Sequence, residues 1–173
     1  VTGVQTCALP IWTMEKDHTL EQAYEQIQRL RAAGLIYDAH IMTGIAGRGR
    51  GLENAEATAE FFNRTRPERI INFSLFLIAG TPLYEDAKAG RFFPASELEN
   101  LEEERRLLQL MEWEGQRVAY DGFHDCITFR VRGRLPGEKE KMLGMLDGAI
   151  KVWKEKEPVF AWALPLHKLQ KDR

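Results

Sequence analysis

The sequence has little cysteine, no long apolar run and no excess of one charge. Only two cysteines occur among 173 residues, too few for a disulfide-dense scaffold. No stretch approaches the roughly 20 apolar residues of a membrane-spanning helix, and the N-terminus lacks the basic start of a secretory signal. Because 24 Lys and Arg face 26 Asp and Glu, overall charge predicts neither nucleic-acid nor membrane binding. We therefore expect a soluble, cytoplasmic protein of about one domain that acts on a small molecule or a peptide.

The first eleven residues differ from the rest of the chain. Residues 1–11 carry no charge and show neither a helical nor an alternating apolar period. The stretch VTGVQTCALPI resembles a reading-frame translation of a common sequencing adapter, so we expect native sequence to begin near Trp12. An adapter joined in frame implies a cut gene, and the remainder is expected to be a C-terminal fragment. Without Cys7, Cys126 stands alone, and no multi-cysteine metal site is expected in the chain.

Apolar residues at helical spacing predict four amphipathic helices and one short one. Thr19 with Gln22, and Ser96 with Glu99, have the form of capping boxes. In the long fourth helix the many charges are assigned to the outer face. The predicted ranges are 20–33, 53–66, 83–88, 97–114 and 138–153.

Two apolar strands, at 35–43 and 70–78, alternate with these helices, and another is expected at 127–131. Apolar strands separated by helices predict an α/β fold with a parallel sheet. One face of the first strand carries His40, and one face of the second carries Asn72 and Ser74. These three would point at a substrate if their faces line a barrel lumen, although buried, hydrogen-bonded core positions explain them too.

Glycines follow both apolar strands, namely Gly44 and Gly47 after the first and Gly80 after the second. Ligands of parallel α/β folds collect at the carboxyl ends of the strands, where glycine lets the backbone approach closely. Simple βα turns explain the same glycines, since the spacing is not the dinucleotide fingerprint. Arg48 and Arg50 in the first loop are candidates for holding a carboxylate or phosphate, with a solvent-exposed pair as the alternative.

The run His124-Asp125-Cys126 places a possible nucleophile near a possible base. Adjacent strand residues point to opposite faces, however, and no third group that would orient the base is evident. The pattern therefore disfavours a catalytic dyad.

A distinctive order of pieces runs from Leu20 to Glu114. A helix ends in RAAGL, a strand and loop read IMTGIAG, and a second helix and apolar strand precede GTPLY at residues 80–84. This order resembles the C-terminal half of the radical S-adenosylmethionine core domain, and the GTPLY segment is similar to that of Fe-S oxidoreductases of the oxygen-independent coproporphyrinogen oxidase type. The sequence GRLP at 133–136 also looks like a continuation known from such proteins.

The resemblance implies a partial (β/α) barrel over 13–115 and a small α+β extension over 116–173. In such enzymes a [4Fe-4S] cluster reduces S-adenosylmethionine to a 5'-deoxyadenosyl radical, which abstracts hydrogen from the substrate. By the same resemblance His40, Asn72 and Ser74 become substrate or cofactor contacts. The implied cofactor contacts are Gly44, Ile45, Gly47, Leu77, Ile78 and Ala79.

The chain also departs from that pattern. It lacks Cys-x-x-x-Cys-x-x-Cys and the early Gly-Gly-Glu segment, and Thr43 and Arg50 replace the Gly and Glu of the Gly-x-Ile-x-Gly-x-x-Glu loop. We therefore expect no metal site and no radical chemistry in this fragment itself. Two alternatives stay open: half of a conventional (β/α) barrel aldolase or dehydrogenase that uses Arg48 and Arg50 on an anionic substrate, or a non-catalytic interaction domain that uses the helix 97–114.

Overall fold

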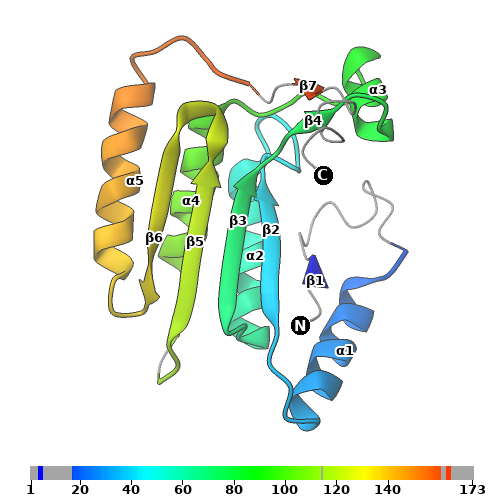
Figure 1. Cartoon of the computed structure of the whole chain (residues 1–173), viewed down its shortest axis with the longest axis vertical. Coiled ribbons are helices and arrows are strands. Elements are labelled where there is room, and N and C mark those ends of the chain that lie inside the picture. The colour runs from blue at the N-terminus through cyan, green and yellow to red at the C-terminus, as the bar shows by residue number, and fades with distance from the viewer. Residues whose placement is uncertain (1–3, 6–16, 114, 161–162, 165–173) are drawn as a thin grey trace, which may run out of the picture.

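A computed structural model describes residues 4–5, 17–113, 115–160 and 163–164, which form a mixed α/β fold (Figure 1). The central sheet has the strand order β1-β2-β3-β5-β6. Neighbouring strands from β1 to β5 pair in parallel, and β6 runs antiparallel to β5. The strands are β1 (Val4–Gln5), β2 (Asp38–Thr43), β3 (Arg69–Ser74), β5 (Val118–His124) and β6 (Phe129–Leu135).

All five predicted helices are present, and three of them begin at side-chain caps that the local sequence encodes, whereas the fourth ends at Leu110 rather than at the predicted residue 114. The Thr19–Gln22 and Ser96–Glu99 capping boxes are both formed, and the Thr81 side chain caps the short helix before Pro82. The α-helices are α1 (Leu20–Ala32), α2 (Gly51–Thr65), α3 (Pro82–Lys88), α4 (Glu97–Leu110) and α5 (Lys139–Trp153).

One face of the sheet carries the core, and none of the described helices lies over the other face. Residues of α1, α2, α4 and α5 share a single apolar cluster with alternate residues of β2, β3, β5 and β6, among them Ile41, Ile70 and Tyr120. Figure 1 shows α2 and α4 behind the sheet and α5 beside β6, whereas no described helix crosses the front of β3, β5 and β6. We call this front the open face.

The strands depart from their predicted ranges in ways that exposure explains. β2 begins at Asp38, because Leu35 and Ile36 are 55% and 66% exposed and belong to the connection before it. β3 ends at Ser74, and Leu77–Ile78 form a separate short strand, β4, which pairs with β7 (Ala163–Leu164).

The hairpin of β5 and β6 differs most from expectation. β5 was not predicted, and the strand expected at 127–131 lies instead at 129–135, after a 3-10 turn over Asp125–Ile127. β5 pairs in parallel with β3, and α5 enters the common core. The part assigned to a C-terminal extension therefore continues the same sheet.

Parts of the predicted termini lie outside the described residues. Of the adapter-like segment 1–11, only Val4–Gln5 is described, as β1. Residues 161–162 and 165–173 of the tail are likewise outside the description. Among the described residues, none of the helices has the length and apolar character to cross a membrane.

Candidate functional site

The register of β2 and β3 separates the three predicted substrate contacts. His40 lies opposite Ile71, while Asn72 lies opposite Ile41. His40 is therefore on the open face, and Asn72 and Ser74 are under the helices, 0% and 1% exposed. The three do not face one lumen together, and for Asn72 and Ser74 the alternative of buried, hydrogen-bonded core positions holds. Alternation defines two faces per strand but does not say which face the helices cover.

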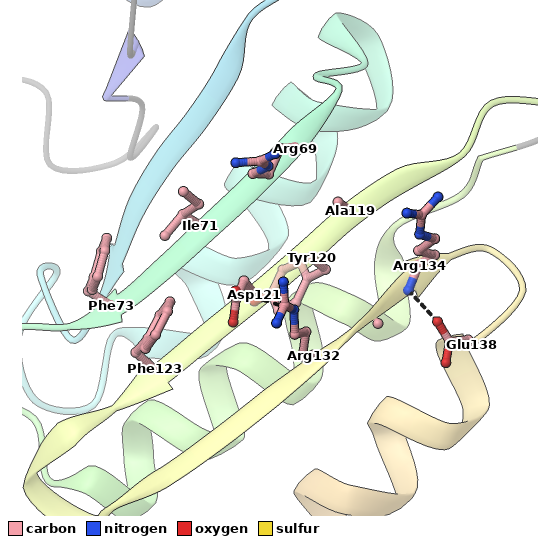
Figure 2. Close-up of a pocket in the computed structure, with 11 residues that line it drawn as sticks. Arg69, Ile71, Phe73, Ala119, Tyr120, Asp121, Phe123, Arg132, Arg134 and Glu138 are labelled. Carbon is pink, nitrogen blue, oxygen red and sulfur yellow. Dashed lines mark hydrogen bonds and ion pairs between the residues drawn. The ribbon is translucent and has the colours of Figure 1, made fainter.

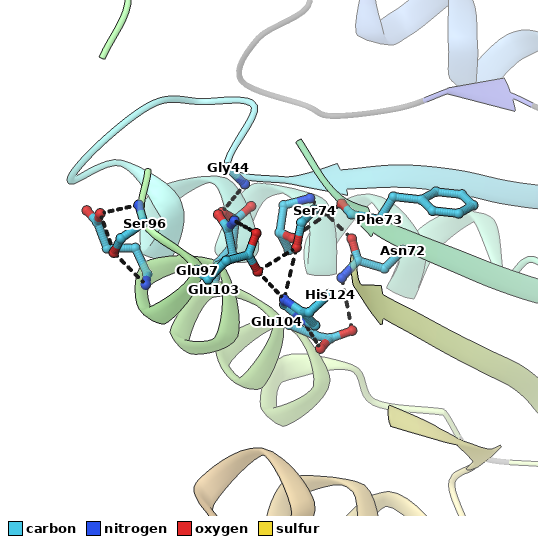
Figure 3. Close-up of polar contacts among 12 residues, drawn as sticks. Gly44, Asn72, Phe73, Ser74, Ser96, Glu97, Glu103, Glu104 and His124 are labelled. Atoms are coloured by element: carbon cyan, nitrogen blue, oxygen red, sulfur yellow. Dashed lines mark hydrogen bonds and ion pairs between the residues drawn. The ribbon is translucent and has the colours of Figure 1, made fainter. Parts of the chain in front are cut away.

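Glu103 of α4 joins that helix to the glycine loop after β2 (Figure 3). Its Oε2 accepts a hydrogen bond from the main-chain N–H of Gly44 at 2.9 Å, and its Oε1 accepts one from the Asn54 amide at 2.7 Å. All of this is buried. The position of the loop is therefore set by a side chain from 59 residues further along the chain.

His124, at the end of β5, lies between two other carboxylates of α4. Its Nδ1 is 2.9 Å from Glu97 Oε2 and its Nε2 is 2.8 Å from Glu104 Oε2. The Ser74 hydroxyl donates to Glu97 Oε2 at 2.9 Å. A protonated imidazole donates to both carboxylates at once, which makes both hydrogen bonds charge-assisted.

Glu104 extends this network to the middle of the sheet. Its Oε1 accepts hydrogen bonds from the Asn72 amide at 2.9 Å and the Tyr120 hydroxyl at 2.8 Å. The Asn72 oxygen in turn accepts from the N–H of Thr43 at 3.2 Å. The network thus connects α4 to the carboxyl ends of β2 and β3 and to β5.

Burial and mutual contact shift the pKa values of this group. Burial lowers the pKa of His124, but the Glu104 and Glu97 carboxylates outweigh it and raise the value from 6.5 to about 9. Burial raises the pKa of Glu103 from 4.5 to about 7, against the hydrogen bonds from Asn54 and Gly44. Burial also raises the pKa of Tyr120, as does its neighbour Glu104. At neutral pH His124 is therefore a buried cation between carboxylates.

The arrangement holds the strand ends rather than reacting with a substrate. Glu97, Glu104 and His124 are each 0% exposed, so no substrate reaches them. The prediction that the charges of this helix lie on its outer face is wrong for Glu97, Glu103 and Glu104, which are at most 3% exposed. The signal was present, because Glu97 and Glu104 are seven residues apart, on the same stripe as the buried Leu101 and Leu108.

The two predicted loop glycines are required by contacts within the chain. Gly44 and Gly47 have φ angles of 80° and 84°, a region that favours glycine. A Cβ on Gly44 would lie 2.5 Å from the Asn100 Oδ1, and one on Gly47 would lie 3.2 Å from the Phe93 carbonyl oxygen. Ile45 between them is buried.

The structure gives the two loop arginines different partners. The Arg48 guanidinium lies 5.2 Å from the centre of the Phe160 ring, whereas Arg50 forms an exposed ion pair with Glu53 at 3.3 Å. They are not brought together around a common point. The second predicted cofactor segment, 77–79, has Leu77 in a small cluster with Leu75 and Phe92, and Ile78 and Ala79 half-buried.

The structure also disfavours a catalytic pair in the run His124-Asp125-Cys126, because both ring nitrogens of His124 face glutamates. The His124 ring points into the buried network, and Asp125 begins the 3-10 turn. Within the described ranges, no three His, Cys, Asp or Glu side chains are grouped so that they could hold a metal ion.

A hollow of about 620 Å³ lies on the open face between β3 and β6 (Figure 2). The register defines three rows across it. Phe73 and Phe123 lie in the row nearest the carboxyl ends of the parallel strands. The other two rows contain Ile71, Asp121 and Arg132, and then Arg69, Ala119 and Arg134.

These features define a class of protein: an α/β fold with a largely parallel sheet, helices on one face, and a hollow on the other. No family model matches the chain. Over 102 residues, which are 58% of the chain, it is 30% identical to the tRNA uridine(34) acetyltransferase of Methanocaldococcus jannaschii. The matched part is 19% of that protein's length, so the chain spans a small portion of it. The likeness connects the chain with an enzyme, though over one segment of that enzyme only.

Proposed function

We propose that the chain is the C-terminal half of a radical S-adenosylmethionine barrel, cut from an iron-sulfur oxidoreductase that abstracts hydrogen from a small-molecule or peptide substrate. The motif order from Leu20 to the GTPLY segment at 80–84 supports this assignment. The parallel arrangement of β2, β3 and β5, with helices between them, is compatible with consecutive units of such a barrel.

The observation that carries the proposal is the one-sided covering of the sheet. Doubly wound folds place helices on both faces of a parallel sheet, whereas a barrel keeps them on the outside and turns the other face to its lumen. Here the core residues of α1, α2, α4 and α5 all lie on one side. The open face then corresponds to the inner side of the parent barrel, and its row nearest the carboxyl ends of the strands lies toward the end at which barrel enzymes hold their substrates.

The residues at hand do not fit the iron-sulfur cluster. Such clusters are held by cysteine thiolates, and Cys126 is the one cysteine among the described residues. The glycine loop also leaves no open space for S-adenosylmethionine directly beside Gly44 and Gly47, since Asn100 and Phe93 occupy it. The proposal therefore places the cluster in the upstream part of the parent, and no step is assigned to this chain's own side chains.

Recovering the upstream gene tests the proposal. We expect a Cys-x-x-x-Cys-x-x-Cys motif about half a barrel before Leu20, and we expect the purified parent to bind iron and release 5'-deoxyadenosine from S-adenosylmethionine under reducing conditions. Serine replacements of those cysteines are the matched control and should abolish both. A complete reading frame without the motif would overturn the proposal.

The 173-residue chain offers a second, independent check. After anaerobic incubation with iron and sulfide it should retain no cluster, because the ligands are upstream. A stable cluster on the chain itself would contradict the proposal that the cluster ligands lie in the upstream part of the parent.

The two alternatives have less support in the structure. A conventional barrel enzyme that grips an anion with Arg48 and Arg50 is disfavoured by their separate partners. An interaction domain that uses the apolar side of α4 is disfavoured because Leu101, Leu107 and Leu108 are at most 2% exposed in the core.

A second candidate function is favoured by the likeness to the tRNA-modifying enzyme. On this hypothesis the parent acts on tRNA. The complete parent would then bind tRNA with a dissociation constant well below that for double-stranded DNA of equal length, in a filter-binding assay at physiological salt. Equal affinities would exclude this candidate.

A further inference from the structure

We propose that the open face binds a small molecule in which a planar unsaturated ring carries a carboxylate or phosphate group. The inference rests on the proposed function only in taking this face as the substrate side of the parent. Its evidence is the chemistry of the three rows that cross β3, β5 and β6.

The row nearest the carboxyl ends of the parallel strands offers an aromatic surface. The rings of Phe73 and Phe123 are stacked, with centroids 5.3 Å apart and planes inclined by 13°. The Arg130 guanidinium lies 4.2 Å from the centre of the Phe123 ring. Both phenylalanines are half-buried and remain accessible from the hollow. A planar ring can pack against such a surface with little loss of conformational freedom.

The strands of the open face carry net positive charge, and one of their arginines, Arg130, lies in the aromatic row itself. On this face, β2, β3, β5 and β6 carry four arginines and two aspartates, a formal charge of +2, whereas the whole chain has −2. Asp121 pairs with both Arg130, at 2.6 Å, and Arg132, at 3.6 Å, so one carboxylate is shared by two cations. The Arg132 side chain is still 73% exposed.

Two further guanidiniums are available beside it. The Arg69 guanidinium lies 3.9 Å from the Asp38 carboxylate, the upper limit for an ion pair, and the Arg69 side chain is 55% exposed. The Arg134 guanidinium makes no ion pair or hydrogen bond with the part of the chain that the structure describes. The Glu138 carboxylate, which also lines the hollow, accepts from the Arg134 main-chain N–H (Figure 2). Arg132 and Arg134 are therefore the groups that would grip an anion bidentately.

The size of the hollow favours a small molecule over a polymer. Its volume of about 620 Å³ is within the usual range for small-molecule sites, roughly 300–1,000 Å³. The phenylalanine row and the row of Arg69 and Arg134 lie at opposite ends of the same hollow, with Arg132 in the row between them, so one compact ligand would contact both a ring and a guanidinium.

Paired probes test this on the purified 173-residue chain. 2-Naphthoate and 2-naphthyl phosphate each join a planar ring to an anion, and 2-naphthylmethanol has the ring alone. By calorimetric titration at low salt, we expect at least one anion to bind about tenfold more tightly than the alcohol. We expect this preference to shrink as salt is added.

Variants separate the two parts of the site. The double substitution Arg132→Gln with Arg134→Gln should remove the preference for the anion and leave alcohol binding unchanged, whereas Phe123→Leu should weaken both probes alike. Arg106→Gln is the matched control, since that arginine pairs with Glu56 away from the open face. Circular dichroism confirms that each variant is folded.

Three outcomes would overturn the inference: equal affinity for the anions and the alcohol, an unchanged preference in the double variant, or tighter binding of a single-stranded oligonucleotide than of either naphthyl anion. None of these touches the upstream cysteine motif. Conversely, absence of that motif would overturn the proposed function and leave the probe preferences intact, so the two failures are distinguishable.

Discussion

Glu103 Oε2 and the main-chain nitrogen of Gly44 are 2.9 Å apart in the interior of the protein. This contact fixes the start of the loop that follows β2, at the end of the sheet where parallel α/β folds bind their ligands. The loop is therefore held by a carboxyl group whose pKa is raised by burial to about 7. The free energy of unfolding should then change when Glu103 is substituted and when the pH is varied.

Two substitutions of Glu103 should distinguish the contribution of its hydrogen bonds to stability from that of its charge. Glu103→Ala leaves the Gly44 N–H and the Asn54 amide unpaired in the core, and we expect a loss of about 1–3 kcal/mol per group in urea unfolding. Glu103→Gln should be tolerated, because Asn54 Oδ1 has no partner. If the Asn54 amide rotates by half a turn, this oxygen accepts from the new glutamine NH₂ group.

Glu102→Ala is the control for that pair, since Glu102 forms an exposed ion pair with Lys154 and should change stability by no more than about 0.5 kcal/mol. Equal losses for Glu103→Ala and Glu102→Ala would show that the buried contact contributes nothing.

Stability should fall as pH rises from about 4.5 to 9. The folded state raises the pKa of Glu103 from 4.5 to about 7 and that of His124 from 6.5 to about 9. Over those two windows the folded state binds more protons than the unfolded state, so the free energy of unfolding decreases with pH. The contribution of His124 is complete below pH 6.5 and lost through pH 9. Urea midpoints measured across this range test the slope.

Variants assign the two windows. His124→Gln should flatten the midpoint between pH 6.5 and 9, and Glu103→Gln should flatten it between pH 4.5 and 7. His40→Gln is the control, because that ring lies on the other face of the sheet from the α4 carboxylates. A midpoint that rises with pH over both windows would refute the assigned directions.

Gly122 should not tolerate a side chain. A Cβ at this position in β5 would fall on the carboxylate of Glu104 and lie 3.0 Å from Val131 Cγ1. Gly122→Ala therefore displaces a buried group that holds Asn72 and Tyr120, and we expect a loss of several kcal/mol by thermal or urea unfolding.

The opposite effect is expected for a glycine with space around it. Gly148→Ala, in α5 where nothing lies within 4 Å of the added atom, should stabilise the chain by about 0.5–1 kcal/mol through helix propensity. Similar effects of the two substitutions would contradict the packing described around Glu104.

Removing the shared aspartate should strengthen anion binding on the open face. Asp121→Asn releases Arg130 and Arg132 from their common partner, and we expect 2-naphthoate to bind about two- to fivefold more tightly, a gain of the size of one exposed ion pair. Asp147→Asn, which breaks the pair with Arg105 on the helical side, should have no effect. Weaker binding in Asp121→Asn would mean that this carboxylate positions the arginines rather than competing for them.

Local signals predicted the helices, and long-range contacts decided the rest. The capping boxes at Thr19 and Ser96 need only residues three positions away, so their helices begin where expected. β5 alternates a buried Val, Tyr and His with half-buried Ala and Asp. This apolar pattern is too weak to predict a strand from the sequence, and the strand is defined by its pairing with β3. The carboxylate partners of His124 come from α4, 20 and 27 residues earlier, and nothing around His124 in the sequence indicates them.

From Ile71 onward, β3 has its polarity reversed relative to a usual amphipathic strand. Asn72 is fully buried within a hydrogen-bonded interior, while Ile71 and Phe73 face the hollow. Engineering for solubility by hydropathy alone would therefore alter the wrong side of the strand: polar substitutions belong at Ile71, and an apolar residue in place of Asn72 would strand the Thr43 N–H and the Glu104 carboxylate inside the protein.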